Sequence, residues 1–469
     1  MAVDFNELPE DLRRRLQQYG QEHVLAGWDR LNEVERFLFL GQLTILDLDE
    51  LQRLHARRHS KDAIPEFRRL ATLPQPTEST TQLEEFRRLG EQALRAGEVA
   101  FLIVAGGQGT RLGFDHPKGM FPIGPVSGKT LFQLHAEKIL AQQRRYGKTL
   151  PLLVMTSPAT HDETLAFFNE YKHFGLPQQH VHFFCQGTMP ALDFDSGKLL
   201  LEAPGRLCLS PNGHGGVLAA LQNHGLFECL QRDGVRTISY FQVDNPLTNL
   251  ADLEFLGRHL AQRAEVSTKV LPKKHPKEKM GNLVLVDGRC SIIEYSDLPD
   301  DWAARADDKG GFFFWGGNTA IHLFDVDFLR RVSAQRDGIP WHLAKKKVPY
   351  FGCDGQFVQP AQENAVKFER FIFDILPLAD RWTVAATTRD RDFEPVKNAT
   401  GDDSPDTARR ALIHQAATWL DHAGVSVPRD TQGQVSVPLE ISPLFALDSG
   451  ELQARIKPGL RIEKPTYLE

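Results

Sequence analysis

The feature that most constrains this chain is an apolar run followed directly by a glycine-rich segment. Residues 99–104, Val-Ala-Phe-Leu-Ile-Val, show no alternation of polar and apolar side chains. Such a run is typical of a strand buried on both faces of a parallel sheet. The next segment, residues 105–113, contains Gly106, Gly107 and Gly109. We therefore expect a glycine loop at the end of a buried strand.

This loop has the properties of a phosphate-binding site. Glycines permit positive φ angles and keep Cβ atoms away, so that successive backbone N–H groups can turn toward a phosphate. Arg111 and Lys118 add positive charge to the same part of the chain. Together these residues favour binding of a nucleotide triphosphate.

Two better-known phosphate motifs fit less well. The dinucleotide motif needs a third glycine, where this chain has Leu112, and an acidic residue about 20 positions later, which is missing after the next expected strand at 152–155. Residues 124–130, Gly-Pro-Val-Ser-Gly-Lys-Thr, are one residue shorter than a P-loop. We interpret them as a turn, with Thr130 as the N-cap of the following helix.

Composition limits the class of protein. A chain of 469 residues with 41% hydrophobic residues can bury a large core and predicts two or three domains. A net charge of −6 gives no indication of nucleic-acid or membrane binding. The five cysteines are scattered and form no C-x-x-C pair, which favours reduced thiols over a zinc site or disulfides. We expect a cytoplasmic protein without nucleic-acid or membrane partners.

Changes in pattern along the chain predict three domains. Residues 1–95 show apolar residues at helical spacing and predict a helical N-terminal region. Residues 96–400 show strands alternating with helices, which is typical of a doubly wound, Rossmann-like α/β domain. Residues 401–469 predict a helix and a small β-rich appendage.

Polar residues follow two further expected strands of the α/β domain. Gln186 and Gly187 follow the strand from residue 181, and Asp244 and Asn245 follow the strand from residue 237. Ligands in such sheets bind beyond the carboxyl ends of the strands. A carboxylate aimed at a triphosphate there would be repelled unless a cation lay between them. Mg²⁺ is suited to this role because one or two carboxylates and phosphate oxygens hold it, so Asp244 is the candidate metal ligand; a turn or helix cap is its structural alternative.

At this point a family resemblance is visible. Residues 105–128 closely resemble the signature loop of the eukaryote-type UDP-sugar pyrophosphorylases, above all the UDP-N-acetylhexosamine pyrophosphorylases, and further motifs extend the resemblance from about residue 90 to about residue 420. The resemblance implies a nucleotidyltransferase that joins UTP to a hexose 1-phosphate and releases pyrophosphate, with Mg²⁺ as cofactor. N-acetylglucosamine 1-phosphate is the sugar it favours. The oligomeric state, monomer or homo-oligomer, stays open.

The resemblance also implies roles for individual residues. Arg111 and Lys118 would stabilise the α-phosphate and the departing pyrophosphate, and Lys397 the sugar phosphate. The residues implied at the nucleotide are Ala105, Gly106, Gly107, Gly109, Thr110, Gln186, Gly187 and Gly213. The residues implied at the sugar are His214, Gly215, Asn245, Glu294 and Asn318.

Departures from the family pattern leave alternatives open. Asn212 replaces the usual aspartate in the second glycine loop, residues 211–216, and Gly316 with Gly317 stands where the family often has Ala-Gly. A UDP-glucose or UDP-galactose pyrophosphorylase is therefore one alternative. A catalytically silent nucleotide-sugar binding protein is another. The joint presence of Arg111, Lys118, Asp244 and Lys397 argues against the silent protein, since binding alone would not require all four.

Overall fold

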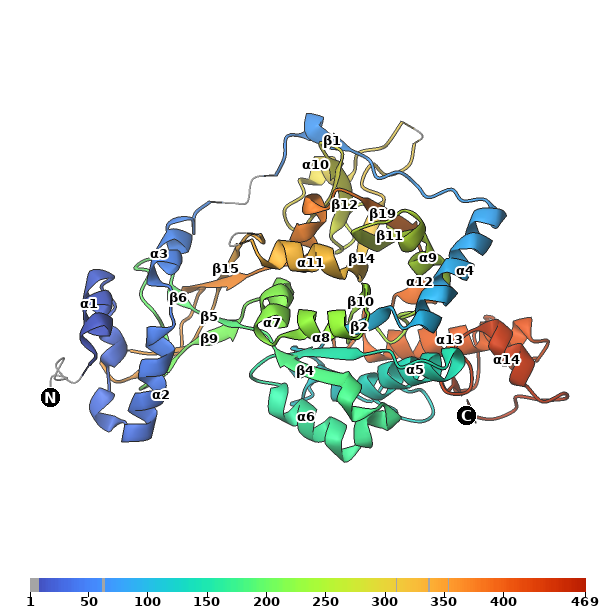
Figure 1. Ribbon diagram of the computed structural model, residues 1–469, viewed down its shortest axis with the longest axis horizontal. Coiled ribbons are helices and arrows are strands. Elements are labelled where there is room, and N and C mark those ends of the chain that lie inside the picture. Colours follow the sequence, from blue (N-terminus) through green and yellow to red (C-terminus); the bar gives the residue numbers. More distant parts are fainter. Residues whose placement is uncertain (1–7, 61–63, 309, 336–337, 353) are drawn as a thin grey trace. The chain divides into compact units, whose positions relative to one another are not determined.

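The computed structural model describes residues 8–60, 64–308, 310–335, 338–352 and 354–469 (Figure 1). Contacts within the chain divide it into two compact units. The first unit comprises the described residues of Met1–Ala63, Gly187–Gly216 and Ile339–Ile372, and the second those of Ile64–Gln186, Val217–Gly338 and Phe373–Glu469. Each unit is thus built from three separate stretches of sequence, a division that does not follow the predicted boundaries at residues 95 and 400.

A mixed sheet lies at the centre of the second unit and has ten strands in the described part of the chain. Four neighbouring strands run parallel in the order β10, β2, β3, β4, and β14 joins β10 in the antiparallel direction. The predicted α/β fold is confirmed. The ten strands are β1 (Leu70–Ala71), β2 (Val99–Val104), β3 (Leu152–Thr156), β4 (Val181–Cys185), β10 (Thr237–Gln242), β11 (Val266–Pro272), β12 (Asn282–Val286), β13 (Arg289–Ile293), β14 (Gly316–Asp325) and β19 (Trp382–Ala386).

The four parallel strands end at the same edge of the sheet. Strand β2 is buried along its whole length, as its unbroken apolar sequence predicts. Val104 at its end pairs with Gln242 of β10 and with Met155 of β3, and β3 pairs with β4 as far as Cys185. The segments that follow these strands therefore start side by side.

Helices cover the sheet of the second unit. Thr130 caps the first of them after the glycine loop, because its side chain accepts a hydrogen bond from the Gln133 backbone N–H at 3.2 Å. Helices α6 and α7 both contact β4, with α7 above it and α6 below it in Figure 1. The helices of this unit are α4 (Thr80–Ala96), α5 (Leu131–Tyr146), α6 (His161–Glu170), α7 (Val217–Asn223), α8 (Leu226–Arg232), α9 (Leu253–Ala261), α10 (Asp300–Ala303), α11 (Val326–Ser333), α12 (Arg389–Asp392), α13 (Pro405–His422) and α14 (Ser449–Arg455).

Helix α4 belongs to the second unit although the sequence pattern placed it with the N-terminal helices. It packs closely on α9, because glycines at the crossing let the two backbones meet. A Cβ atom at Gly90 would lie 2.4 Å from the Leu253 carbonyl oxygen, and one at Gly257 would lie 1.7 Å from the Phe86 carbonyl oxygen. Helical periodicity alone does not reveal which domain a helix packs against.

The first unit combines three helices with three small sheets. Helices α1 (Glu10–Gln18), α2 (Glu33–Thr44) and α3 (Leu48–Ala56) share one apolar core with inward side chains such as Leu192 and Phe368. The strand orders are β15-β18-β6, β17-β16-β7-β8 and β5-β9. Their bounds are β5 (Thr188–Pro190), β6 (Leu192–Asp193), β7 (Leu201–Ala203), β8 (Arg206–Leu207), β9 (Leu209–Pro211), β15 (His342–Lys346), β16 (Tyr350–Phe351), β17 (Phe357–Val358) and β18 (Ala365–Glu369).

The C-terminal region has its own small core. It contains α13, α14 and a parallel pair of short strands, β20 (Leu439–Ile441) and β21 (Thr466–Leu468). Its buried residues include Leu420 and Leu452. The sequence pattern predicted a helix followed by a small β-rich appendage. The predicted helix is α13. The appendage has less β structure than predicted, because the proline-containing segments around residue 440 pair over only three residues and α14 is helical.

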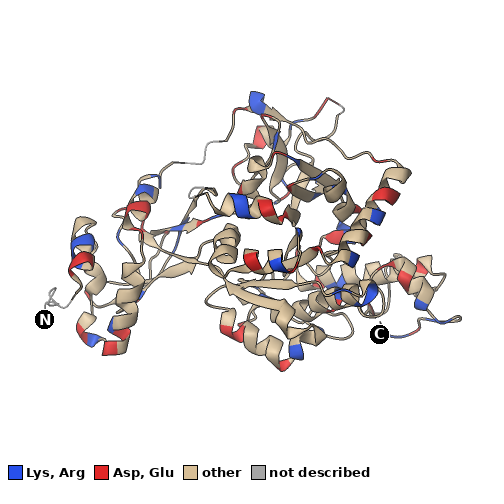
Figure 2. Ribbon diagram, viewed as in Figure 1, with Lys and Arg blue, Asp and Glu red and all other residues tan. Residues whose placement is uncertain are grey.

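Charged residues of both signs are interspersed on the helices, for example on α1 and α4 (Figure 2). Among the described residues, no helix combines the length and the apolar character needed to cross a membrane. Cys185, Cys208, Cys229 and Cys290 are free thiols, and Cys353 lies outside the described residues.

Candidate active site

The glycine loop after β2 is closed by backbone hydrogen bonds. The Ala105 N–H donates to the Met155 carbonyl at 2.8 Å, which continues the sheet by one residue. The Lys118 N–H donates to the Gly107 carbonyl at 3.0 Å, and the Gly109 N–H donates to the His116 carbonyl at 2.9 Å. These bonds fold residues 107–118 back on themselves, so that Lys118 returns to the end of β2.

Gly106 and Gly109 allow close packing at the loop, whereas Gly107 borders open space. Among the glycines of the loop, positive φ occurs at Gly113, at +69°, and not at Gly106, Gly107 or Gly109, so these three do not use the conformational freedom that glycine permits. A Cβ atom at Gly109 would lie 2.7 Å from the Phe114 carbonyl oxygen. At Gly107 it would meet nothing within 4 Å. Gly107 therefore faces open space, as a residue that a phosphate approaches should.

Arg111 and Lys118 bring two different kinds of positive charge to this loop. Thr110 and Arg111 lie in a short 3₁₀ helix, Thr110–Leu112, and both are exposed. Among the described residues, Arg111 has no ion-pair partner. Lys118 is partly buried, and its Nζ lies 3.4 Å from Oδ2 of Asp244. The loop thus offers one paired cation and one that is available to a ligand.

Asp244 reaches Lys118 because β10 and β2 are neighbours. The Val243 N–H donates to the Val104 carbonyl at 3.1 Å, so the segment after β10 begins beside the glycine loop. The Asp244 carbonyl oxygen then accepts from the Val396 N–H at 2.8 Å. That bond attaches the segment that contains Lys397 to the segment that contains Asp244. Three residues predicted from distant parts of the sequence are therefore carried by adjoining segments.

Lys397 lies beside an acidic residue that sequence reasoning missed. Its Nζ is 3.8 Å from Oδ2 of Asp403, and its N–H donates to the Asp403 carbonyl at 2.6 Å. Burial raises the pKa of Asp403 above its ordinary value, against the opposing effect of Lys397, and the charge of Asp244 adds to the rise. No motif marks Asp403. It reaches Lys397 because the chain turns back through positive φ angles at Gly401 and at Asp403 itself.

Gln186 also lies at the glycine loop. Its N–H donates to the Thr156 carbonyl at 2.9 Å, and its side chain is buried against Gly106, where a Cβ atom would lie 2.9 Å from Gln186 Oε1. Ser157, which the sequence analysis did not single out, donates through Oγ to the Gly106 carbonyl at 2.8 Å. The amide of Gln186 is therefore placed at the first glycine of the loop.

Two of the predicted sugar residues come together elsewhere in the second unit. Gly281 lies between them: a Cβ atom there would be 2.9 Å from Glu294 Oε1 and 3.6 Å from Asn318 Cβ. The Asn318 N–H donates to the Gly281 carbonyl at 2.8 Å, and its Oδ1 accepts from the Ala320 N–H at 2.9 Å. Ala320 has a φ of +56°, and the pairing of β14 with β11 shifts register at this point. The irregular strand sets the direction of the Asn318 side chain.

Asn245 has a different environment from the one predicted. It is only 3% exposed, its Nδ2 donates to the Asp392 carbonyl at 2.6 Å, and its Oδ1 accepts from the Glu394 N–H at 3.1 Å. The side chain thus joins two chain segments, which fits a structural role better than contact with a sugar. Its partners, residues 392–394, lie almost 150 positions away in the sequence, so no local pattern indicates this role.

The remaining predicted residues belong to the first unit. The Gly187 carbonyl accepts from the Asn212 N–H at 3.0 Å. Gly213 and Gly215 pack against Arg370: a Cβ atom at Gly213 would lie 2.4 Å from the Arg370 carbonyl oxygen, and the Gly215 N–H donates to that oxygen at 2.7 Å. Close backbone packing is why this second loop requires glycines.

His214 is held as a neutral imidazole. Its Nδ1 accepts from the Ile372 N–H at 3.2 Å, and its ring lies 5.3 Å from that of Phe371. Burial, with a smaller contribution from His342, lowers the pKa of His214 to about 4. Since Nδ1 is an acceptor, the proton of the neutral ring lies on Nε2, which makes that atom a donor.

The P-loop-like turn at residues 124–130 binds an anion from the chain itself. The N–H groups of Val126 and Ser127 both donate to Glu440 Oε2 at 2.7 Å, and Ser127 Oγ donates to Oε1 at 2.5 Å. Lys129 pairs with Glu137 at 2.8 Å. The interpretation of this segment as a turn before a helix is confirmed.

Among the described residues, no cluster of three or more histidine, cysteine, aspartate or glutamate side chains is arranged to hold a metal ion. Asp244 is a partly buried carboxylate just after the end of β10. A metal that bound there would take its remaining ligands from water or from a phosphate-containing substrate.

Comparisons with known proteins bear directly on this site. The family described as UTP–glucose-1-phosphate uridylyltransferase matches residues 50–447. The chain is 35% identical to UDP-N-acetylhexosamine pyrophosphorylase-like protein 1 of Xenopus tropicalis, over 96% of this chain and 94% of that protein. It is 35% identical to UDP-N-acetylglucosamine diphosphorylase 2 of Arabidopsis thaliana, over 94% of this chain and 91% of that protein.

A solved structure agrees with these matches. The uridine diphosphate N-acetylglucosamine pyrophosphorylase of Trypanosoma brucei, crystallised with an inhibitor, superposes with a TM-score of 0.80 at 28% identity, over 97% of this chain and 95% of that chain. The full-length matches and the site at the ends of β2, β4 and β10 lead to one conclusion: the chain belongs to the UTP–glucose-1-phosphate uridylyltransferase family and is a nucleotidyltransferase.

Proposed function

We propose that this enzyme transfers the uridylyl group of UTP to an N-acetylhexosamine 1-phosphate, with N-acetylglucosamine 1-phosphate as the preferred acceptor, and releases pyrophosphate. The observation that carries the proposal is the pairing of Lys118 with Asp244 at 3.4 Å beside the glycine loop. The names of the full-length relatives support the choice of sugar.

The reaction needs charge neutralisation and alignment more than a base. A phosphate oxygen of the sugar 1-phosphate attacks the α-phosphorus of UTP in line, and the bond from that phosphorus to the bridging oxygen breaks, leaving pyrophosphate with the bonding electrons. Since the attacking group is already an anion, no proton has to be removed. The main obstacle is repulsion between phosphates, which positioned cations reduce.

The cations of the site divide this task. Arg111 is exposed and without an ion-pair partner among the described residues, which suits contact with UTP and the departing pyrophosphate. Lys118 is partly buried and oriented by Asp244, which suits the α-phosphate. Lys397 adjoins Asp244 through Val396 and suits the sugar phosphate.

The residues present also fit a magnesium ion. Asp244 supplies one carboxylate at the strand end, and Mg²⁺ in phosphoryl-transfer sites is commonly held by one or two carboxylates together with substrate phosphates. Asp244 would hold the ion, with its charge balanced in the absence of metal by Lys118. When bound, Mg²⁺ neutralises charge on the phosphates.

Sugar selection would fall to Glu294 and Asn318 in the second unit. These side chains converge at Gly281. A sugar without a matching hydroxyl or amide group would leave the carboxylate or the side-chain amide without a hydrogen-bond partner, which costs binding free energy. We further propose a cytoplasmic location, which the free thiols of the described cysteines favour.

The test is pyrophosphate release by the purified protein with UTP and Mg²⁺, measured separately with N-acetylglucosamine, N-acetylgalactosamine and glucose 1-phosphates. We expect the largest kcat/KM with N-acetylglucosamine 1-phosphate. A larger kcat/KM with glucose 1-phosphate would replace the proposed sugar and keep the reaction. Binding of UDP-sugar without any pyrophosphate release would support the silent binding protein instead.

A further inference from the structure

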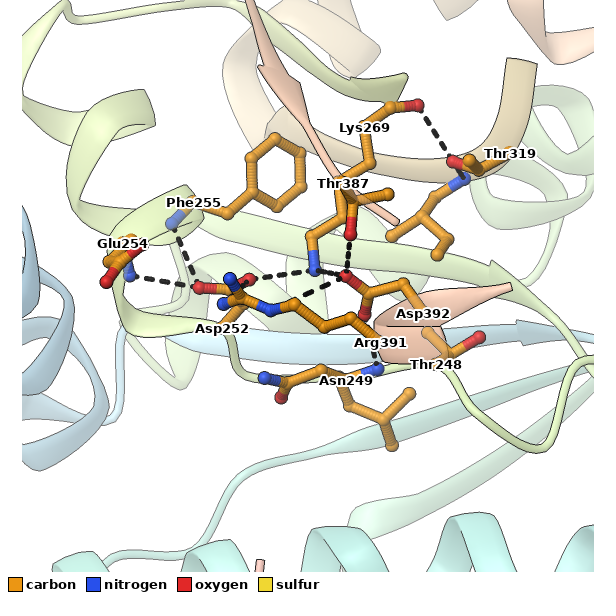
Figure 3. Close-up of polar contacts among 12 residues, drawn as sticks. Thr248, Asn249, Asp252, Glu254, Phe255, Lys269, Thr319, Thr387, Arg391 and Asp392 are labelled. Carbon is orange, nitrogen blue, oxygen red and sulfur yellow. Dashed lines mark hydrogen bonds and ion pairs between the residues drawn. The ribbon is translucent and has the colours of Figure 1, made fainter. Parts of the chain in front are cut away.

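Lys269, Asp252, Asp392 and Arg391 form a buried ion-pair network (Figure 3). Lys269, in strand β11, is 1% exposed, and its Nζ lies 2.7 Å from Asp392 Oδ2 and 2.8 Å from Asp252 Oδ2. Arg391 adds a second cation, 2.9 Å from the same oxygen of Asp252. Burial alone would lower the pKa of Lys269, but the two carboxylates raise it, and Lys269 and Arg391 hold the pKa of Asp252 at about 2.

Asp392 is the fully buried member of the network. It is 0% exposed, and both of its carboxylate oxygens are engaged. Oδ2 accepts from Thr387 Oγ1 at 2.6 Å in addition to Lys269, and Oδ1 accepts from the Asn249 N–H at 3.1 Å. Figure 3 shows these donors converging on Asp392 from different chain segments. The carboxylate thus joins the segment after β10 to the segment after β19.

These two segments are the ones that carry the predicted reacting groups. Besides the bond to Asn249, the Asp392 carbonyl accepts from Asn245 Nδ2 at 2.6 Å. The Val396 N–H donates to the Asp244 carbonyl at 2.8 Å, and Lys397 is the next residue. Asp392 therefore lies at the far end of a row of hydrogen bonds that finishes beside Asp244 and Lys397.

Helix α5 holds the other side of the segment after β10. His135 Nε2 lies 3.1 Å from the Val243 carbonyl, and Lys138 Nζ donates to the carbonyls of Pro246 and Thr248. Burial lowers the pKa of His135 to about 3, so its ring is neutral. The segment after β10 is therefore held both by side chains of α5 and by Asp392.

A buried network of charges is weak evidence for stability. Desolvation of the ions offsets much of their attraction, and apolar replacements of such groups are often neutral. The placement of this network is more informative than its energy. The network connects the two segments that must hold Asp244 and Lys397 in position at the phosphates.

We propose that Asp392 is a positioning residue, which, with Lys269 as its buried counter-ion, sets the position of Lys397 relative to Asp244. The inference rests on the proposed function, since that function places Lys397 and Asp244 at the phosphates. Asp392 itself is fully shielded from solvent, so its proposed role is to position other groups rather than to contact substrate.

The test is a mutant cycle with pyrophosphate release as the readout. Asp392→Asn keeps the size of the side chain and removes the charge that faces Lys269. We expect kcat to fall about 100-fold with the KM for UTP nearly unchanged, since a small misplacement of reacting groups costs about that factor. In a Lys397→Ala background the same substitution should lower kcat less than threefold, because its effect passes through Lys397.

A matched control separates positioning from stability. Arg258, on α9 of the same unit, forms a largely buried ion pair with Glu78, and within the described part of the chain neither side chain bonds to the segments that carry Asp244 and Lys397. Arg258→Met should lower the melting temperature while leaving kcat within about twofold of the wild-type value. If Asp392→Asn does not fold, Thr387→Val takes its place, because it removes one hydrogen-bond donor to Asp392. It should lower kcat in the wild-type background and lower kcat much less in the Lys397→Ala background.

Equal effects of Asp392→Asn in the wild-type and Lys397→Ala backgrounds would overturn the positioning role, because a merely structural residue gives additive losses. Wild-type kcat in Asp392→Asn or in a folded Thr387→Val would also overturn it. A wild-type protein that releases no pyrophosphate with any sugar 1-phosphate would overturn the proposed function, and the positioning role with it.

Discussion

Two glycine-containing turns lie close together in the sequence, and the structure gives them opposite uses. The loop at residues 105–113 leaves Gly107 facing open space and Arg111 without an ion-pair partner among the described residues. The turn at residues 124–130 has its two N–H groups and a hydroxyl bonded to Glu440, which lies 314 positions from Val126. Backbone N–H groups in a turn attract any anion. Whether they serve a ligand depends on whether the chain already supplies a carboxylate.

The largest expected effect is on activity, at the open loop. Arg111→Ala should lower kcat/KM for UTP about 100- to 1,000-fold, because one charged donor to a developing anion is lost. The melting temperature should stay within about 1 °C, since Arg111 is exposed and without an ion-pair partner among the described residues. Steady-state kinetics and thermal unfolding measure the two effects. Normal turnover would remove Arg111 from the mechanism.

Loss of the contact between Glu440 and the turn at residues 124–130 should lower the stability of the protein rather than its activity. Glu440→Ala leaves the N–H groups of Val126 and Ser127 without their acceptor, which should reduce the free energy of unfolding by about 2 to 3 kcal/mol. Ser127→Ala is the matched control and should cost about 1 kcal/mol, since only the hydroxyl bond is lost. Urea denaturation measures both. An unchanged midpoint for Glu440→Ala would show that the contact does not hold the turn.

Steric packing within the open loop gives a third contrast. Gly109→Ala places a Cβ atom 2.7 Å from the Phe114 carbonyl oxygen, and relief of that overlap should cost about 1 to 2 kcal/mol of stability. Thermal unfolding without ligand tests this directly. A variant as stable as the wild type would mean that residues 109–114 move apart without cost.

The smallest expected effect comes from the neighbouring glycine. Gly107→Ala meets no atom within 4 Å, so the melting temperature should not change. The KM for UTP should rise about tenfold, equivalent to about 1.4 kcal/mol, if a phosphate approaches this backbone. A lower melting temperature, or an unchanged KM, would contradict the assignment of Gly107 to the ligand side of the loop.

Local chemistry made several elements predictable. The apolar run at 99–104 is β2 because side chains on both of its faces are buried, and Thr130 caps α5 because its hydroxyl satisfies a free N–H at the helix start. Asp244 stands at the end of a buried strand, as expected from the pattern before it. Each of these features depends on residues within a few positions of one another.

Other features could not be read from local patterns. The two parts of the α4 and α9 crossing are separated by more than 160 residues, and Glu440 lies 314 positions from Val126 in the turn that it fills. Asn245 carried a predicted sugar role, whereas its amide bonds with residues 392–394. No spacing rule in the chain indicates such pairs, because they meet only through packing of the sheet.

By itself, the sequence determined the α/β class, the glycine loop after a buried strand, and the charged residues available for phosphate chemistry. The tertiary structure alone decided that Lys118 pairs with Asp244, that Glu440 fills the second turn, and that Lys269 and Asp392 are buried together. The physical reason is the separation in sequence between the residues that interact. Burial and hydrogen bonding along a strand or helix act between near neighbours, whereas the partner of a charge depends on which segments the folded sheet brings within a few ångströms.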